Sequence, residues 1–104
     1  MFARHVSIHL KSNMLSDYTR TFENDTLPLL RQQKGFKDEI TLSNPGSLDV
    51  IAISLWEIKA NAETYNTNTY PQVLRTLERM IDGTPKVQTF EAVTSTFHKL
   101  AVAA

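Results

Sequence analysis

The chain has 104 residues, contains no cysteine and balances 11 basic against 11 acidic side chains, so its formal net charge is zero. This length and a 41% apolar composition predict one globular domain over residues 1–104. The balanced charge argues against a nucleic-acid partner, which would need clustered basic side chains. No segment approaches the roughly 20 apolar residues of a membrane span. The lack of cysteine excludes disulfides and thiolate chemistry and suits a cytoplasmic location.

The N-terminal third predicts a strand followed by a helix. Residues 2–10 alternate in polarity, with one drier face that Arg4 interrupts, and they contain no continuous apolar run. This pattern predicts a strand and not a signal peptide. We expect Asn13 to cap the helix that follows and Pro28 to kink or restart it. Gly35 is expected to end it in a left-handed conformation.

The next two segments predict an antiparallel hairpin. Residues 36–43 alternate in polarity, which places Phe36, Ile40 and Leu42 together on one expected face. Residues 44–47, "NPGS", form a turn because proline presets its own backbone angle and glycine accepts a positive one. The apolar stretch "DVIAISLW" then supplies the second strand of the hairpin.

The second half of the chain predicts two helical pieces and a long last strand. A short helix is expected from Asn61, and Thr69 has the spacing of a capping box before an amphipathic helix over 70–81. Residues 86–98 alternate again and predict the last strand. The order β-α-β-β-α-β predicts an α+β, ferredoxin-like sandwich in which both helices cover one face of a four-stranded antiparallel sheet.

The strand over residues 49–56 is apolar on both faces, which bears on assembly. Trp56 belongs to the face expected under the helices, whereas Ile51, Ile53 and Leu55 belong to the other face. Leaving three such side chains in water would forfeit about 1.5 to 3 kcal/mol of burial each. We therefore expect a homodimer through sheet-to-sheet packing, with the last strand reaching toward the partner.

Three stretches, "LPLLRQQKGFKDEITL", "VIAISLWEIKANAETY" and "STFHK", together resemble the antibiotic biosynthesis monooxygenase-like family of small dimeric α/β barrels. The resemblance implies a fold more than a reaction, because the family includes cofactor-free oxygenases, heme-degrading enzymes, isomerase-like members and proteins with no assigned reaction. The heme-degrading pattern uses an asparagine on the first strand and a tryptophan and a histidine on the second helix. This sequence lacks that pattern, so heme degradation is not favoured.

Candidate catalytic residues are His5, His9 and Tyr65. A histidine can act as a base near neutral pH, and a tyrosine can donate a hydrogen bond to a phenol or quinone oxygen. The alternative for each histidine is an interface or surface position, and for Tyr65 it is core packing. The two histidines do not suggest a shared metal, because four strand residues at about 3.3 Å each separate them by roughly 13 Å. His98, at the end of the last predicted strand, is a further weak candidate.

Candidate substrate-binding residues are Trp56, Tyr70 and Arg75. Trp56 either closes the core against the helices or walls a ligand cavity, since aromatic walls are typical of both. Tyr70 follows the break between the two helical pieces, and Arg75 either binds substrate or lies on the solvated helix face.

Two functions remain open at this level. The first is a cofactor-independent monooxygenase of an electron-rich aromatic such as a phenol, quinol or anthrone, which would need no cofactor and no metal because the deprotonated substrate itself reduces oxygen. The alternative is a non-catalytic dimeric protein that binds a small hydrophobic ligand or serves as a stress-related accessory protein.

Overall fold

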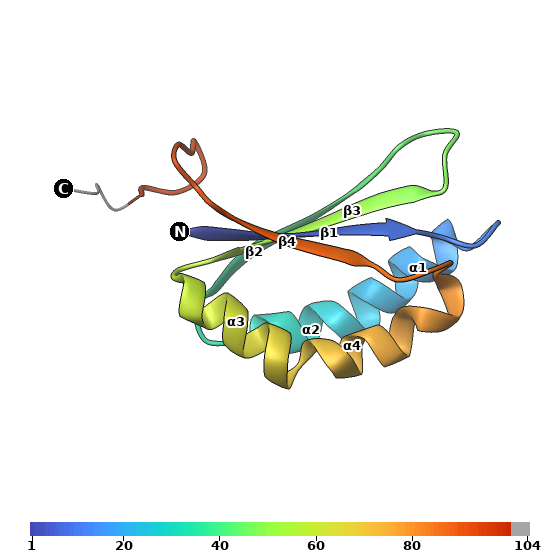
Figure 1. Ribbon diagram of the computed structural model, residues 1–104, viewed down its shortest axis with the longest axis horizontal. Helices are drawn as coiled ribbons and strands as arrows, with labels where there is room; N and C mark the ends of the chain where they lie inside the picture. The colour runs from blue at the N-terminus through green and yellow to red at the C-terminus, as the bar shows by residue number, and fades with distance from the viewer. Residues whose placement is uncertain (101–104) are drawn as a thin grey trace.

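Residues 1–100 are described by a computed structural model, in which strands and helices follow the predicted order (Figure 1). None of the helices in this range has the length and apolar character that crossing a bilayer requires. The elements are β1 (Phe2–His9), α1 (Leu15–Thr21), the π-helix η1 (Phe22–Thr26), α2 (Leu27–Arg31), β2 (Phe36–Ser43), β3 (Asp49–Trp56), α3 (Lys59–Asn68), α4 (Tyr70–Leu77), the 3-10 helix η2 (Glu78–Met80) and β4 (Lys86–Glu91).

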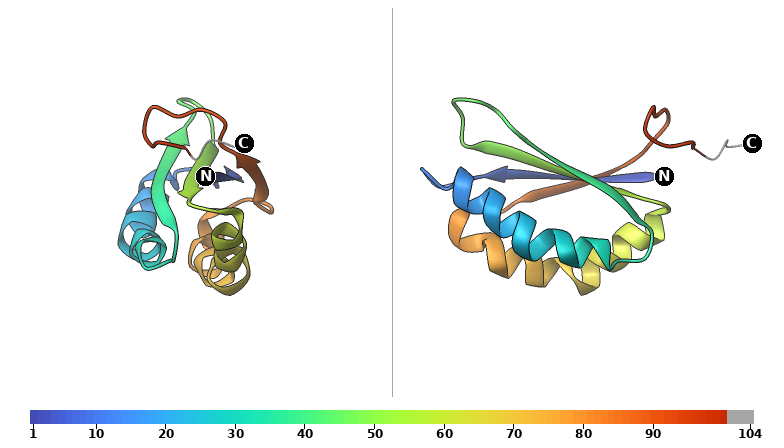
Figure 2. Two further views of the ribbon diagram at one scale, coloured as in Figure 1. Left: turned by 90° about the vertical axis from the view of Figure 1, so that its left-hand side faces the viewer. Right: turned by 180° about the vertical axis from the view of Figure 1, so that it is seen from behind.

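The four strands form one sheet in the order β2-β3-β1-β4, and every neighbouring pair is antiparallel. Both helical segments, α1 to α2 and α3 to η2, lie under the same face of this sheet (Figures 1 and 2). The opposite face, which we call the outer face, carries no helix (Figure 2). The predicted α+β, ferredoxin-like fold is confirmed.

The core lies between the helices and the inner face of the sheet. Alternate residues of β1 and β3 point toward the helices, because successive side chains of a strand point to opposite faces. The fully enclosed side chains include Trp56, Tyr18, Leu10 and Met80. A polar residue, Arg4, occupies one of the inward positions of β1 and is only 3% exposed.

A β-bulge early in β2 changes the expected faces of that strand. Phe36 pairs with Trp56, but the next paired residue is Asp38, so Lys37 is the extra residue. As a result, Phe36 faces the helices, whereas Ile40, paired with Ile53, faces outward. The prediction that Phe36 shares a face with Ile40 and Leu42 was therefore wrong. The same shift turns Glu39 inward beside Ser54.

Glycines behave as predicted at two turns. Gly46 has φ +79° in the hairpin turn, where Ser47 N donates to Asn44 O at 3.0 Å. Gly35 also has φ +79°, and a methyl group added at its Cα would overlap the side chain of Asn61. Glycine is thus required there both by the backbone angle and by the close approach of α3.

Of the two predicted helix caps, that of Asn13 was wrong and that of Thr69 was right in position but not in its hydrogen bond. Asn13 lies before the cap position, which Met14 occupies, and it has the left-handed φ of 63°. Thr69 does stand at the break between α3 and α4, but its side chain makes no cap hydrogen bond. Its hydroxyl instead donates to Gln33 Oε1 at 3.4 Å, across to the end of the first helical segment. The expected restart near Pro28 is present, because α2 carries this proline in its first turn and follows η1.

The last strand is shorter than predicted. β4 ends at Glu91, and residues 92–100 contain no strand. Val93 and Phe97, whose spacing extended the alternation, are 84% and 82% exposed. The segment turns back over the outer face, where Phe97 and His98 border a hollow with Leu55 and where His98 contacts Asp38.

Candidate functional site

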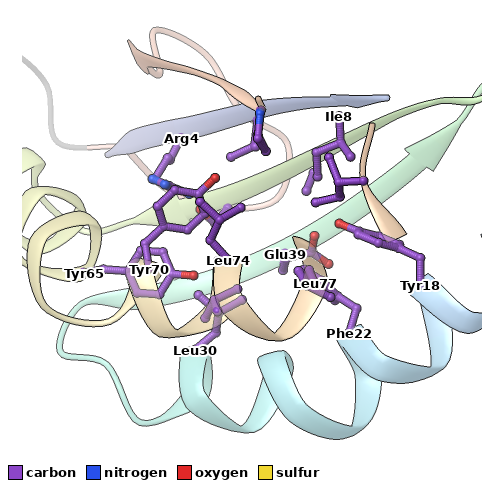
Figure 3. A pocket seen from close by; sticks show the side chains of 16 residues that line it. Arg4, Ile8, Tyr18, Phe22, Leu30, Glu39, Tyr65, Tyr70, Leu74 and Leu77 are labelled. Atoms are coloured by element: carbon purple, nitrogen blue, oxygen red, sulfur yellow. The ribbon is translucent and has the colours of Figure 1, made fainter. Parts of the chain in front are cut away.

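A small cavity lies between the helices and the inner face of the sheet (Figure 3). Its volume is about 40 Å³, and apolar side chains from the helices and from the inner face of the sheet form most of its wall. That space holds a few water molecules but is well below the roughly 300 to 1,000 Å³ of ordinary ligand pockets. Four side chains in the wall, Arg4, Glu39, Tyr65 and Tyr70, carry polar groups that bear on chemistry.

Arg4 is the buried cation of this cavity. Its Nη2 donates to Asn66 Oδ1 at 2.8 Å, and its guanidinium carbon lies 4.1 Å and 5.1 Å from the ring centroids of Tyr70 and Tyr65. Burial lowers the pKa of Arg4, and the two tyrosines oppose that shift. Its Nε is buried and has no hydrogen-bond partner among residues 1–100. A buried donor without a partner is costly, so Nε of Arg4 keeps an unused capacity to donate a hydrogen bond.

Glu39 is the acidic group in the same wall, and it is there because of the bulge at Lys37. Thr41 Oγ1 donates to Glu39 Oε2 at 2.6 Å. Burial raises the pKa of Glu39, and the hydrogen bond from Thr41 opposes the rise. A carboxyl group in this state can accept a proton from a weakly acidic substrate more readily than an exposed carboxylate can.

Three tyrosines, Tyr18, Tyr65 and Tyr70, line the cavity. Burial raises the pKa of Tyr65 to about 12, with Arg4 opposing, so the phenol stays protonated and can donate a hydrogen bond. Burial also raises the pKa of Tyr18, whose hydroxyl has no hydrogen-bond partner within residues 1–100. Tyr18 stacks on Phe22 at a ring separation of 5.8 Å. It was not singled out from the sequence, where it served only as one apolar position of a helix.

Trp56 packs behind this cavity. Its side chain is fully buried, its Nε1 donates to Ser54 Oγ at 2.8 Å, and its ring lies 5.1 Å from that of Tyr65. Trp56 thus packs against Tyr65 without lining the cavity, whereas Tyr65 lines it. Of the two alternatives weighed for Trp56, this position corresponds to closure of the core.

The structure does not bring His5 and His9 to Tyr65. His5 pairs with Ile53 and Gln88 across the sheet, and its side chain lies on the outer face, edge-on to Phe90. His9, on the same face, has Nδ1 at 2.8 Å from Asp49 Oδ1 and is exposed. Odd and even residues of β1 face opposite sides, so Arg4 takes the inward position that a histidine base would need.

Arg75 also lies away from the cavity. It is exposed on α4, while Val73, Leu74 and Leu77 of the same helix face inward. Of the six residues singled out from the sequence, the structure therefore brings Tyr65 and Tyr70 to the cavity wall. Arg4 could have been found as the one charge on an otherwise apolar strand face, whereas Glu39 could not, because a bulge leaves no mark in the alternation.

Comparison with known proteins concerns the fold. No family model matches the sequence, and no curated protein matches it either. Among solved structures, SnoaB from Streptomyces nogalater, a cofactor-independent oxygenase, is similar with a TM-score of 0.76 at 12% identity, over 91% of this chain and 95% of that one. A candidate antibiotic biosynthesis monooxygenase from Nitrosomonas europaea aligns with a TM-score of 0.74 at 11% identity, over 90% of this chain and 100% of that one.

A further Nitrosomonas europaea structure, of unknown function, aligns with a TM-score of 0.76 at 14% identity, over 98% of this chain and 95% of that one. At such identities the likeness concerns the course of the backbone and not the site. The resemblance noted in the sequence is confirmed at that level: the chain has the fold of the antibiotic biosynthesis monooxygenase structures.

Proposed function

We propose that the protein is a cofactor-independent monooxygenase that acts on an electron-rich aromatic compound in the cavity beside Arg4. One observation carries this proposal: a buried guanidinium with a free Nε lies in an apolar wall that also holds Tyr65 and Glu39. A cation in a closed apolar site stabilises an anion far more than it would in water. The anion of a phenol or an anthrone is the species that reacts with oxygen without a cofactor.

The chemistry can be written with these side chains alone. Glu39 accepts the proton that leaves the substrate, while Arg4 stabilises the resulting anion and Tyr65 donates a hydrogen bond to its oxygen. The anion gives one electron to O₂, and the substrate radical and superoxide then combine into a peroxide. Loss of water from the protonated peroxide leaves a carbonyl group. In sum, a methylene group and O₂ yield a carbonyl group and one water.

The size of the cavity is equally compatible with a second candidate. At about 40 Å³ the enclosed space is smaller than a single aromatic ring, so a substrate must displace part of the wall. A protein that only holds a small ligand, without turnover, would suit this volume equally well. The second candidate is therefore a dimeric binding protein of the same fold that uses Arg4 as an anchor.

A homodimer through the outer face remains part of the proposal. Ile40, Leu42 and Phe90 on this face are 54%, 47% and 52% exposed, and Ile51, Ile53 and Leu55 lie beside them, half-buried. A second copy of the sheet would cover this apolar face at a gain of roughly half the 1.5 to 3 kcal/mol of full burial for each large side chain, because these side chains are already about half-buried. A cytoplasmic location, suggested by the lack of cysteine, likewise stays a prediction.

Oxygen uptake by chelator-treated protein, measured with a panel of hydroquinones, catechols and anthrones, tests the function. We expect saturable uptake that falls about tenfold or more in Arg4→Met and in Tyr65→Phe, since each change removes a hydrogen bond to a charged or developing anionic group. Arg79→Met removes an exposed arginine elsewhere and should leave uptake unchanged. Binding of panel members without uptake would favour the second candidate.

His5→Ala distinguishes the present site from the one expected from the sequence. His5 lies on the outer face, so this variant should retain full uptake. Loss of uptake in His5→Ala with full uptake in Arg4→Met would overturn the assignment of the cavity as the reaction site.

A further inference from the structure

A surface cleft adjoins the enclosed cavity on the side of β4. It lies between α3, the start of α4 and the edge strand β4, has a volume of about 670 Å³, and is lined by polar and apolar side chains together, among them Asn66, Thr89 and Val87. Cavity and cleft have only two residues in common, Arg4 and Tyr70. These two side chains therefore lie between the small apolar cavity, in whose wall Figure 3 shows them, and the larger cleft, which is more polar than the cavity.

Arg4 and Tyr70 contact each other directly. The guanidinium carbon of Arg4 lies 4.1 Å from the ring centroid of Tyr70 and 5.1 Å from that of Tyr65, and on the cleft side Arg4 Nη2 donates a hydrogen bond to Asn66 Oδ1 at 2.8 Å. Asn66 is exposed, and Tyr70 is half-buried at the point where α3 ends and α4 begins. A stacked cation and ring contribute about 0.5 to 2 kcal/mol, which a bound ligand can readily replace.

We infer that Arg4 and Tyr70 form a movable wall and that the ligand binds across it, with an apolar ring in the cavity and an anionic oxygen on Arg4 at the border of the cleft. The inference rests on the proposed function in one respect, since it takes the cavity as the ligand site. It adds the access route and the ligand class: a compact ring system that carries one carboxylate, phenolate or enolate oxygen.

Polarity on the two sides favours this orientation. The cavity beyond the wall is apolar apart from Glu39 and the tyrosine hydroxyls, so it suits a ring, and Glu39 would repel an anion placed deep inside. In the cleft, the carboxylate of Glu63 is paired with Lys59 at 3.7 Å. Lys59 therefore offsets the repulsion between Glu63 and an anion bound at Arg4. Displacing Tyr70 joins the two spaces, which removes the conflict between ligand size and cavity volume.

A second route has to be tested against this one. On the opposite side of the cavity, Tyr18, Phe22 and Glu39 also border a surface cleft, of about 370 Å³, between η1 and β2. That wall consists of a stacked aromatic pair and carries an acid where the first wall carries a cation. An anionic ligand should therefore pass Arg4 and not Glu39.

The test uses 2-naphthoate and its neutral counterpart 2-naphthamide, with affinity from calorimetry and association rate from stopped-flow quenching of Trp56, the one tryptophan. We expect wild type to bind 2-naphthoate about tenfold or more tightly than 2-naphthamide, and Arg4→Met to lose that difference, because a charge-assisted hydrogen bond is removed. Asn66→Leu should speed association, because it frees Arg4 on the cleft side.

Paired variants locate the route. Tyr70→Ala should speed 2-naphthoate association severalfold, whereas Phe22→Ala should not, with Phe22→Leu as the substitute if the smaller side chain prevents folding. Faster association in the Phe22 variants with no change in Tyr70→Ala would overturn the inference. No binding of 2-naphthoate to wild type, or equal binding of the two naphthalenes, would overturn it as well.

The outcome is separable from that of the proposed function. Arg4-dependent binding of 2-naphthoate with no oxygen uptake on any substrate would leave the inference standing and reject the oxygenase. Uptake that depends on Tyr65, together with no preference for the anionic naphthalene, would reject the inference alone.

Discussion

The guanidinium carbon of Arg4 lies 4.1 Å from the ring centroid of Tyr70, although the two residues come from the first strand and the last long helix of the chain. Both side chains border the enclosed cavity and the surface cleft beside it. This contact therefore supplies the positive charge of the site and also lies on the proposed access route.

Trp56→Phe is expected to lower the free energy of unfolding by about 2 kcal/mol. The smaller ring leaves a void behind Tyr65, and Ser54 Oγ loses the hydrogen bond that Trp56 Nε1 donates to it. Urea denaturation followed by far-UV circular dichroism measures the change. Val93→Ala, at a position 84% exposed, is the control and should stay within about 0.5 kcal/mol of wild type. An equal loss in both variants would contradict the buried role of Trp56.

Glu39→Gln is expected to stabilise the protein at neutral pH and to lose this advantage on acidification. Burial raises the pKa of Glu39, so the folded state binds its proton more tightly than the unfolded state does. The wild-type carboxyl therefore costs stability above its folded pKa, and the cost disappears as the pH falls below the unfolded value. The uncharged glutamine escapes that cost at every pH.

Thermal unfolding of both proteins between about pH 4 and about pH 8 checks this pH dependence. The difference between Glu39→Gln and wild type should grow as the pH rises. Glu23→Gln, at an exposed position, should show no such trend. A gap that widens toward acid would mean that the carboxylate is stabilised in the fold, contrary to its buried position.

Gly35→Ala is expected to destabilise the protein by about 2 to 4 kcal/mol, from strain and overlap together. The residue has φ +79°, and the added methyl group would overlap Asn61 on α3. Gly83 has a similar φ of +83° but open space around it, so Gly83→Ala should cost only about 1 kcal/mol. Chemical denaturation of both variants separates the two causes.

The double variant Gly35→Ala with Asn61→Gly isolates the overlap, with Asn61→Gly alone as its reference, because an alanine at 61 would keep the Cβ that lies 2.8 Å from the added methyl group. If the clash with Asn61 causes the part of the stability loss that exceeds the loss in Gly83→Ala, the double variant should lose only the free energy of unfolding that the strained φ accounts for. Persistence of the full loss in the double variant would assign the whole effect to the backbone.

Ile53→Asp is expected to convert the proposed homodimer into a monomer. The side chain lies in the middle of the outer face, where a buried carboxylate without a partner costs several kcal/mol. Ile58→Asp changes an isoleucine that is 54% exposed but lies after β3, beyond the sheet, and it should leave the mass unchanged. Sedimentation equilibrium at micromolar concentration measures both, and a monomeric wild type would reject the dimer outright.

Much of the fold could be predicted because its periodicities are local. The alternation of β1, the turn at Gly46 and the helix with Val73 and Leu77 each depend on neighbours in the sequence. The end of β4 could not be predicted, since Val93 and Phe97 continue the apolar spacing after the backbone has left the sheet. What ends the strand there is the course of the chain over the outer face and not a residue with turn preference.

The site was harder to predict than the fold. His5 was favoured over Arg4 as a site residue because a histidine suits acid–base chemistry, yet the phase of one strand turns the arginine inward. Glu39 required knowledge of the bulge, and Tyr18 required knowledge of which helix face meets β2. Residue type suggested the chemistry, whereas strand phase and packing decide which side chains meet.

The bulge at Lys37 makes the cavity sensitive to the register of β2. If Lys37 entered regular pairing with Leu55, each later residue of β2 would move by one partner, which would send Glu39 outward and bring Ile40 in. The cavity would lose its acidic side chain, and the sheet surface offered to a partner would gain a charge. One shift in strand register would thus alter ligand choice and self-association together, whereas deletion of Lys37 would leave Glu39 inward, because Asp38 already pairs with Leu55.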